Sequence, residues 1–112
     1  MTDGPSGDVT VHTDHPGPAT VVVSGHLGAD CARELRRVTA APDAEHSLVL
    51  DLRPCTSIDP PGLGALVGCI RRSDEAGGRI VVLVTDASPV ERMLRSHGVG
   101  RLVRIDVVPM AG

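Results

Sequence analysis

The sequence of 112 residues contains no Phe, Tyr or Trp, and its 11 basic residues are all arginine. A core without aromatic rings has to be filled by Val, Leu, Ile and Ala, which suits a β-sheet covered by helices. The arginines are scattered and the net charge is −3. Nucleic-acid binding is therefore excluded, because there is no basic stripe for phosphates and no ring on which a base could stack.

The sequence also lacks a long hydrophobic run. The longest, at residues 19–23 and 80–84, are far shorter than the ~20 residues that cross a bilayer. Residues 1–7 are polar and rich in Gly and Pro, with neither the basic nor the apolar part of a signal peptide. We therefore expect no membrane span, a loose tail at 1–7, and one cytoplasmic domain at 8–112.

Cysteine is scarce and has no metal-site or redox spacing. The three residues, Cys31, Cys55 and Cys69, are predicted to be reduced thiols that pack as small hydrophobic side chains. The His and Asp residues at 12–15 are interpreted as surface polar groups, because a strand-to-turn location offers no fourth ligand. We predict neither a metal nor a cofactor.

Hydrophobic periodicity predicts the order β-β-α-β-α-β-α-β. Strands are expected at residues 9–12, 19–24, 47–52, 79–84 and 101–108, and helices at 29–41, 61–76 and 88–98. Residues 25–28 should close the N-terminal hairpin, and residues 54–61 should form a loop. The fold class is therefore α/β: a mixed, mostly parallel sheet with an N-terminal hairpin.

Residues 48–78 are the most informative stretch, because a polar turn there leads into a helix. Asp59 is predicted either to cap that helix or to contact a partner. Pro60 should be extended and Pro61 the first helical residue, since a residue before proline avoids the α region. Thr56 and Ser57 are loop hydroxyls that most often bond to backbone.

These segments, in this order, resemble the STAS domain family, and more closely the bacterial anti-anti-sigma factors (anti-sigma factor antagonists). The similarity covers residues 8–108. It rests on V-V-S-G at 22–25, L-V-L-D-L at 48–52, I-D-P-P-G-L at 58–63, A-G-G-R-I at 76–80 and V-E-R-M-L-R-S-H-G-V-G-R-L at 90–102.

The resemblance implies a regulator that binds a protein and is not an enzyme. Members of that family bind an anti-sigma factor that is also a serine kinase, and the kinase phosphorylates a hydroxyl at the start of the second helix. Here those positions are Pro60 and Pro61, which have no hydroxyl. The family often has Gly-Glu-Leu-Asp after the second strand, where this sequence has Gly-His-Leu-Gly at 25–28.

We therefore expect binding to an anti-sigma factor or serine kinase without phosphorylation at the usual position, with Thr56 and Ser57 as possible displaced phosphosites. The predicted partner surface consists of Gly25, His26, Asp30, Ser57, Asp59, Pro60, Pro61, Gly62, Leu63 and Leu66.

Three other interpretations stay open. The same fold could serve as an accessory subunit of a transporter or of a signalling scaffold, and a homodimer is possible. The start of the second helix could instead hold a small anionic ligand. An enzyme has the weakest support, because the sequence shows no nucleophile–base pair.

Overall fold

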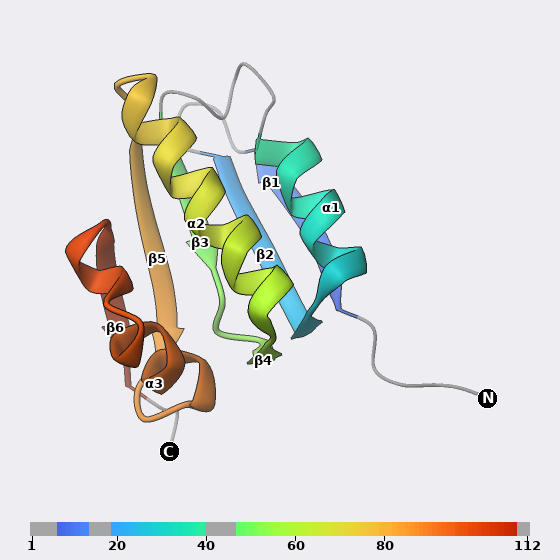
Figure 1. The fold of residues 1–112 in the computed structure, drawn as a ribbon, viewed down its shortest axis with the longest axis vertical. Coiled ribbons are helices and arrows are strands. Elements are labelled where there is room, and N and C mark those ends of the chain that lie inside the picture. Colours follow the sequence, from blue (N-terminus) through green and yellow to red (C-terminus); the bar gives the residue numbers. More distant parts are fainter. Residues whose placement is uncertain (1–6, 14–18, 40–46, 110–112) are drawn as a thin grey trace.

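The structure is a computed structural model, and it describes residues 7–13, 19–39 and 47–109. The chain alternates strands and helices, as the periodicity predicts (Figure 1). The elements are β1 (Asp8–Thr13), β2 (Ala19–Leu27), α1 (Ala29–Thr39), β3 (Ser47–Asp51), β4 (Cys55–Ile58), α2 (Pro60–Glu75), β5 (Arg79–Thr85), α3 (Pro89–Ser96), the 3₁₀ turn η2 (Val99–Arg101) and β6 (Arg104–Val108).

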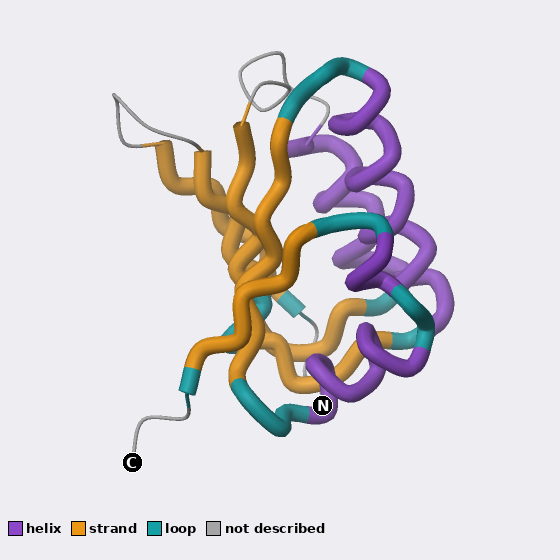
Figure 2. The backbone as a smooth tube through the Cα atoms, turned by 90° about the vertical axis from the view of Figure 1, so that its left-hand side faces the viewer, coloured by secondary structure: helices purple, strands orange, loops and turns teal. Residues whose placement is uncertain are grey.

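The strands form one mixed sheet in the order β1-β2-β3-β5-β6, and β4 pairs with the end of β2. β1 runs antiparallel to β2, and the other pairs are parallel. The described helices lie on one face of the sheet (Figure 2). The predicted mixed, mostly parallel sheet with an N-terminal hairpin is confirmed.

The core lies between the sheet and the helices. β2 alternates buried and half-buried residues along its first six positions, as a strand with one face on the core should. The largest fully buried side chains are all Leu or Val, as expected for a core without aromatic rings: Leu27, Leu35, Leu48, Leu50, Leu52, Leu66, Leu94, Val21, Val23, Val82, Val84 and Val90. Cys31, Cys55 and Cys69 are buried free thiols, as predicted.

Three predicted boundaries are wrong, and one strand, β4, was not predicted. Residues 25–27 continue β2 instead of closing the hairpin, because they pair with the unpredicted strand β4. α2 begins at Pro60, not Pro61, because Asp59 is the extended N-cap (φ −100°, ψ 174°) and accepts the N–H groups of Gly62 and Leu63, which places Pro60 in the first turn even though it precedes a proline. β6 begins at Arg104, because Leu102 and Val103 donate their N–H groups to the carbonyl of Val99 in η2.

The glycine stop of the second helix and the start of the third helix are as predicted. Gly77 takes a positive φ of 78° directly after α2, which only glycine adopts readily. Ser88 caps α3 by accepting from the N–H of Glu91, with Pro89 at the first helical position.

Some predictions lie outside the described residues: the tail at 1–6, the turn at 14–17 and the end of the first helix at 40–43. Among the described helices, none is long and apolar enough to cross a membrane.

Candidate functional site

The site lies where the carboxyl ends of the parallel strands meet the start of α2, at the lower edge of Figure 1. Parallel pairing of β2 with β4 sets His26 beside Ser57 and Leu27 beside Ile58. The register shifts after Gly25, which pairs with Cys55 and has a positive φ of 74°. Thr56 is the extra residue of this bulge, so Ser57 rather than Thr56 lies opposite His26.

His26 bridges Ser57 and Asp59. Its Nδ1 atom lies 2.6 Å from Ser57 Oγ, and its Nε2 atom lies 3.1 Å from Asp59 Oδ2. The carboxylate can only accept a hydrogen bond, so Nε2 carries a proton. In the neutral imidazole Nδ1 is then the acceptor, and the Ser57 hydroxyl donates to it.

Asp59 uses both carboxylate oxygens. Oδ1 accepts the N–H of Gly62 at 2.9 Å, which makes Asp59 the N-cap of α2. Oδ2 faces His26. The Gly62 N–H, followed by the His26 hydrogen bond, lowers the pKa of Asp59. The predicted cap is confirmed, and the carboxylate stays ionised to orient the imidazole.

Two glycines make room for this arrangement. A Cβ atom on Gly28 would lie 2.9 Å from Asp59 Oδ2 and 2.9 Å from the His26 ring. A Cβ atom on Gly62 would lie 2.0 Å from the carbonyl oxygen of Leu27. Gly28 therefore allows the His26–Asp59 contact, and Gly62 allows α2 to start directly against the end of β2.

The first turn of α2 offers few free donors. Pro60 and Pro61 have no N–H, Gly62 donates to the Asp59 carboxylate, and Leu63 donates to the Asp59 carbonyl. The positive end of the helix dipole thus already faces a carboxylate. A second anion would meet that charge, so the geometry argues against an anion site here.

The structure brings most of the predicted residues to one place. His26, Ser57 and Asp59 are half-buried, while Pro60 and Pro61 are exposed beside them. Asp30 is exposed in the first turn of α1, which follows Gly28 directly. Leu66 is a correction: its exposed fraction is 0 %, so it packs in the core and offers no surface to a partner.

Sequence reasoning missed the Ser57–His26 contact. The sequence suggests no nucleophile–base pair, yet the two residues lie 31 positions apart along the chain and within hydrogen-bond distance. Only the pairing of β2 with β4 reveals this, and β4 was predicted to be loop. Thr56 is exposed, and among the described residues its hydroxyl has no hydrogen-bond partner.

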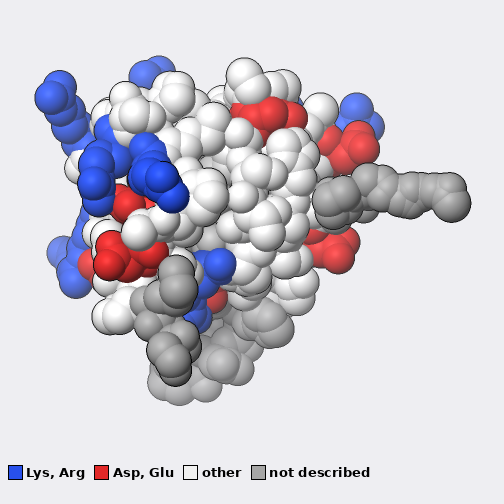
Figure 3. Space-filling view, turned by 90° about the horizontal axis from the view of Figure 1, so that it is seen from below, with Lys and Arg blue, Asp and Glu red and all other residues white. Residues whose placement is uncertain are grey.

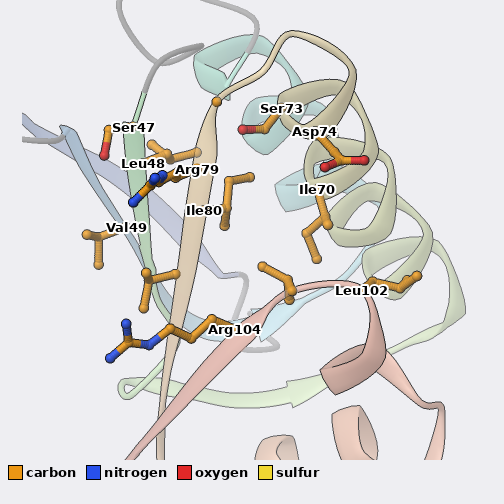
Figure 4. A pocket seen from close by; sticks show the side chains of 13 residues that line it. Ser47, Leu48, Val49, Ile70, Ser73, Asp74, Arg79, Ile80, Leu102 and Arg104 are labelled. Atoms are coloured by element: carbon orange, nitrogen blue, oxygen red, sulfur yellow. The ribbon is translucent and has the colours of Figure 1, made fainter.

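Two hollows lie away from this site. One, of about 450 Å³, opens beside the start of β5 and the end of α2. Figure 4 shows Ser73 and Ile70 of α2 facing Ile80 of β5 across it. The other, of about 300 Å³, lies between α3 and β6 and is lined by Glu91, Arg95 and Val107, among others. Neither is lined by residues of the candidate site.

Comparison with known families gives one match along most of the chain. Residues 11–104 match a family described as "Mlab, STAS domain".

Solved structures of similar fold include anti-sigma factor antagonists. One from Mycobacterium paratuberculosis has a TM-score of 0.76 at 22% identity, over 94% of this chain and 89% of that one. A putative one from Thermotoga maritima has a TM-score of 0.70 at 18% identity, over 92% and 86%. SpoIIAA in its unphosphorylated form has a TM-score of 0.68 at 17% identity, over 88% and 87%, and a phosphorylated form of the same Bacillus protein is also similar. These likenesses confirm the fold.

Proposed function

The chain belongs to the STAS domain family, and from this premise we propose that it is a non-enzymatic regulator that binds an anti-sigma factor or serine kinase. The partner surface is the start of α2 with the adjoining ends of β2 and β4. It comprises His26, Ser57, Asp59, Pro60, Pro61 and Leu63, with Gly25 and Asp30 at its margin. Gly62, which the sequence also placed on this surface, is buried like Leu66 and offers no contact to a partner.

One observation carries the proposal: Pro60 and Pro61 hold this surface stiff and exposed, and neither hollow described above is lined by its residues. Pro60 and Pro61 are exposed at the first two positions of a capped helix, where their fixed φ angles leave little backbone freedom to lose on binding. The face of the molecule seen from below carries an uncharged expanse between charged groups (Figure 3). A stiff, exposed surface of this kind suits a protein better than a small ligand.

Regulation at the usual position is not expected, because the two residues before Gly62 are prolines. The binding we propose therefore does not depend on phosphate at residues 60 or 61. Thr56 and Ser57 are the hydroxyls that remain beside the surface. Mass spectrometry after incubation with the partner and ATP would show whether either one takes a phosphate.

The same two prolines favour a second candidate, an accessory subunit of a transporter or signalling scaffold. A surface that no kinase can modify at the usual position suits a permanent subunit as well as a reversible antagonist. Gene neighbourhood separates the two: sigma-factor or kinase genes nearby favour the first function, and a transport operon favours the second.

The test is calorimetric titration of the purified chain with each anti-sigma factor encoded in the same genome. Pro60→Glu places a charge on the surface, and Glu in a first helical turn is favourable, so the fold should persist. We expect this variant to bind at least about tenfold more weakly, which corresponds to about 1.4 kcal/mol.

Leu102→Glu is the matched control, because Leu102 is an exposed apolar residue (48 %) that directly follows η2 and lines the hollow away from the proposed surface. It should bind as the parent chain does. If no anti-sigma factor binds, or if Pro60→Glu binds as tightly as Leu102→Glu, the proposed surface is wrong.

A further inference from the structure

We infer that Ser57 is an activated hydroxyl and a site of covalent modification, which accepts a group from an activated phosphorus compound. His26 serves as its base. This inference concerns the chemistry of the isolated chain, so it goes beyond the proposed function and does not depend on any partner.

The contact between Ser57 and His26 carries the inference. Ser57 Oγ lies 2.6 Å from Nδ1 of His26, within the reach a general base needs. In this hydrogen bond the Ser57 hydroxyl donates and His26 Nδ1 accepts, because the Asp59 carboxylate fixes the ring proton on Nε2 and leaves the lone pair on Nδ1. A hydroxyl bonded to backbone carbonyls, as the sequence suggests for this loop, would have no such base.

Asp59 acts as a positioning residue. Its Oδ2 atom lies 3.1 Å from His26 Nε2, while the Gly62 N–H holds its other oxygen. The carboxylate is thus anchored to the helix and faces the imidazole, where it stabilises the imidazolium that forms when Ser57 loses its proton. Serine, imidazole and carboxylate are linked as in a nucleophile–base–orienter chain.

Access to Ser57 is open. Its side chain is half-buried, and those of His26 and Asp59 are 39% and 34% exposed. A reagent can therefore reach Oγ without unfolding the chain. Thr56 is more exposed but has no base beside it among the described residues. If exposure alone decided the site, Thr56 would be modified; if the base decides it, Ser57 is modified.

The step balances with a fluorophosphonate as the donor. Ser57 Oγ forms a bond to phosphorus as the P–F bond breaks, and fluoride leaves with the bonding electrons. The hydroxyl proton passes to Nδ1 of His26 and is then released to water. No oxidant or reductant takes part.

The reaction should stop after this single transfer. N–H donors that hold a developing oxyanion would speed both the transfer and a later hydrolysis, and turnover needs both steps to be fast. At the helix start Pro60 and Pro61 have none, Gly62 donates to Asp59 Oδ1, and Leu63 donates to the Asp59 carbonyl. Ser57 is thus suited to hold a group and not to hydrolyse it quickly.

The experiment is labelling of the full chain with an alkyl fluorophosphonate, read out by peptide mass spectrometry and by the labelling rate. We expect one label per chain, on Ser57. Ser57→Ala should remove it and Thr56→Ala should leave it. His26→Gln should slow labelling at least about 100-fold, the usual contribution of a general base.

Asp59→Asn separates positioning from folding. The amide oxygen can still cap α2, so the melting temperature should change little while labelling slows. Gly28→Ala gives a second check, since its Cβ would displace the His26–Asp59 pair.

The inference is overturned if the label falls on Thr56, if folded His26→Gln labels as fast as the parent, or if the parent is not labelled at all. Partner binding is measured separately, on unlabelled protein. A chain that binds its partner but resists the reagent would refute only the activated serine, and a labelled chain that binds no anti-sigma factor would refute only the proposed function.

Discussion

The two ends of α2 are built very differently. At its first turn Asp59 caps the helix and also contacts His26, two prolines occupy the first helical positions, and a Cβ on Gly62 would lie 2.0 Å from a backbone oxygen. Just past its last turn, a Cβ on Gly77 would meet nothing within 4 Å. A hollow of about 450 Å³ lies beside that end.

Ser73 marks the contrast most clearly. It is 8 % exposed, and its Oγ atom is the buried side-chain polar atom without a hydrogen-bond partner among the described residues. At the first turn, by contrast, both Asp59 oxygens and both His26 nitrogens are hydrogen-bonded. The last turn of α2 depends on one particular residue, Gly77 with its positive φ, whereas the first turn requires several particular residues at particular positions.

The largest expected effect concerns the first turn of α2, where Gly62 lies against the end of β2. Gly62→Ala should destabilise the fold by about 3 kcal/mol, the upper part of the range for overpacking, because its Cβ would strike the carbonyl of Leu27 and backbone cannot move aside easily. Gly64→Ala is the matched control on the same helix. Its Cβ would meet nothing within 4 Å, so it should stabilise by about 0.5–1 kcal/mol, the difference in helix propensity.

Urea denaturation of the two variants gives both free energies of unfolding. Similar values for Gly62→Ala and Gly64→Ala would mean that α2 does not start as closely against β2 as the geometry requires.

The contrast also explains what the sequence could predict. The sheet and the three helices were predictable because their signals are local: alternating residues along β2, Ser88 before Pro89, and Gly77 after α2. The Asp59 cap was predictable for the same reason, since the capping side chain and the N–H that donates to it lie three residues apart.

The rest of the site depends on contacts between distant residues. β4 is only four residues long, and its sequence has no clear alternation to mark it as a strand. The register shift at Gly25 then decides whether Thr56 or Ser57 faces His26, and no local pattern contains that information. Gly28 looked like the loss of a family aspartate, yet its role is to leave space for the His26–Asp59 pair.

A smaller effect on stability is expected at the last turn of α2, at Ser73. Ser73→Ala removes a buried hydroxyl that has no partner, and alanine is the better helix former. It should therefore leave stability unchanged or raise it by up to about 1 kcal/mol, measured by urea denaturation. Ser57→Ala is the comparison at the other end, where the hydroxyl is hydrogen-bonded and its loss should be unfavourable. A clear loss of stability in Ser73→Ala would show that the last turn is as specifically held as the first.

The smallest expected effect is on how the free energy of unfolding depends on pH in acid. The pKa of Asp59 is lowered by the Gly62 N–H and by His26, so protonating its carboxylate costs the folded state more than the unfolded one. Its stabilising contribution is fully present above the unfolded pKa of about 3.9 and is lost as the pH falls through the lower, folded pKa.

Asp59→Asn cannot titrate at this position, so the unfolding free energy of the variant should fall less steeply below pH 4 than that of the parent chain. The slope should shrink without vanishing, because the pKa of Asp51, held down by Arg53, is lowered too. The change should be modest, since Asp59 and His26 are partly exposed and water screens their interaction. Urea denaturation at several pH values measures it, and equal slopes for the two proteins would mean that the first turn of α2 contributes nothing to acid sensitivity.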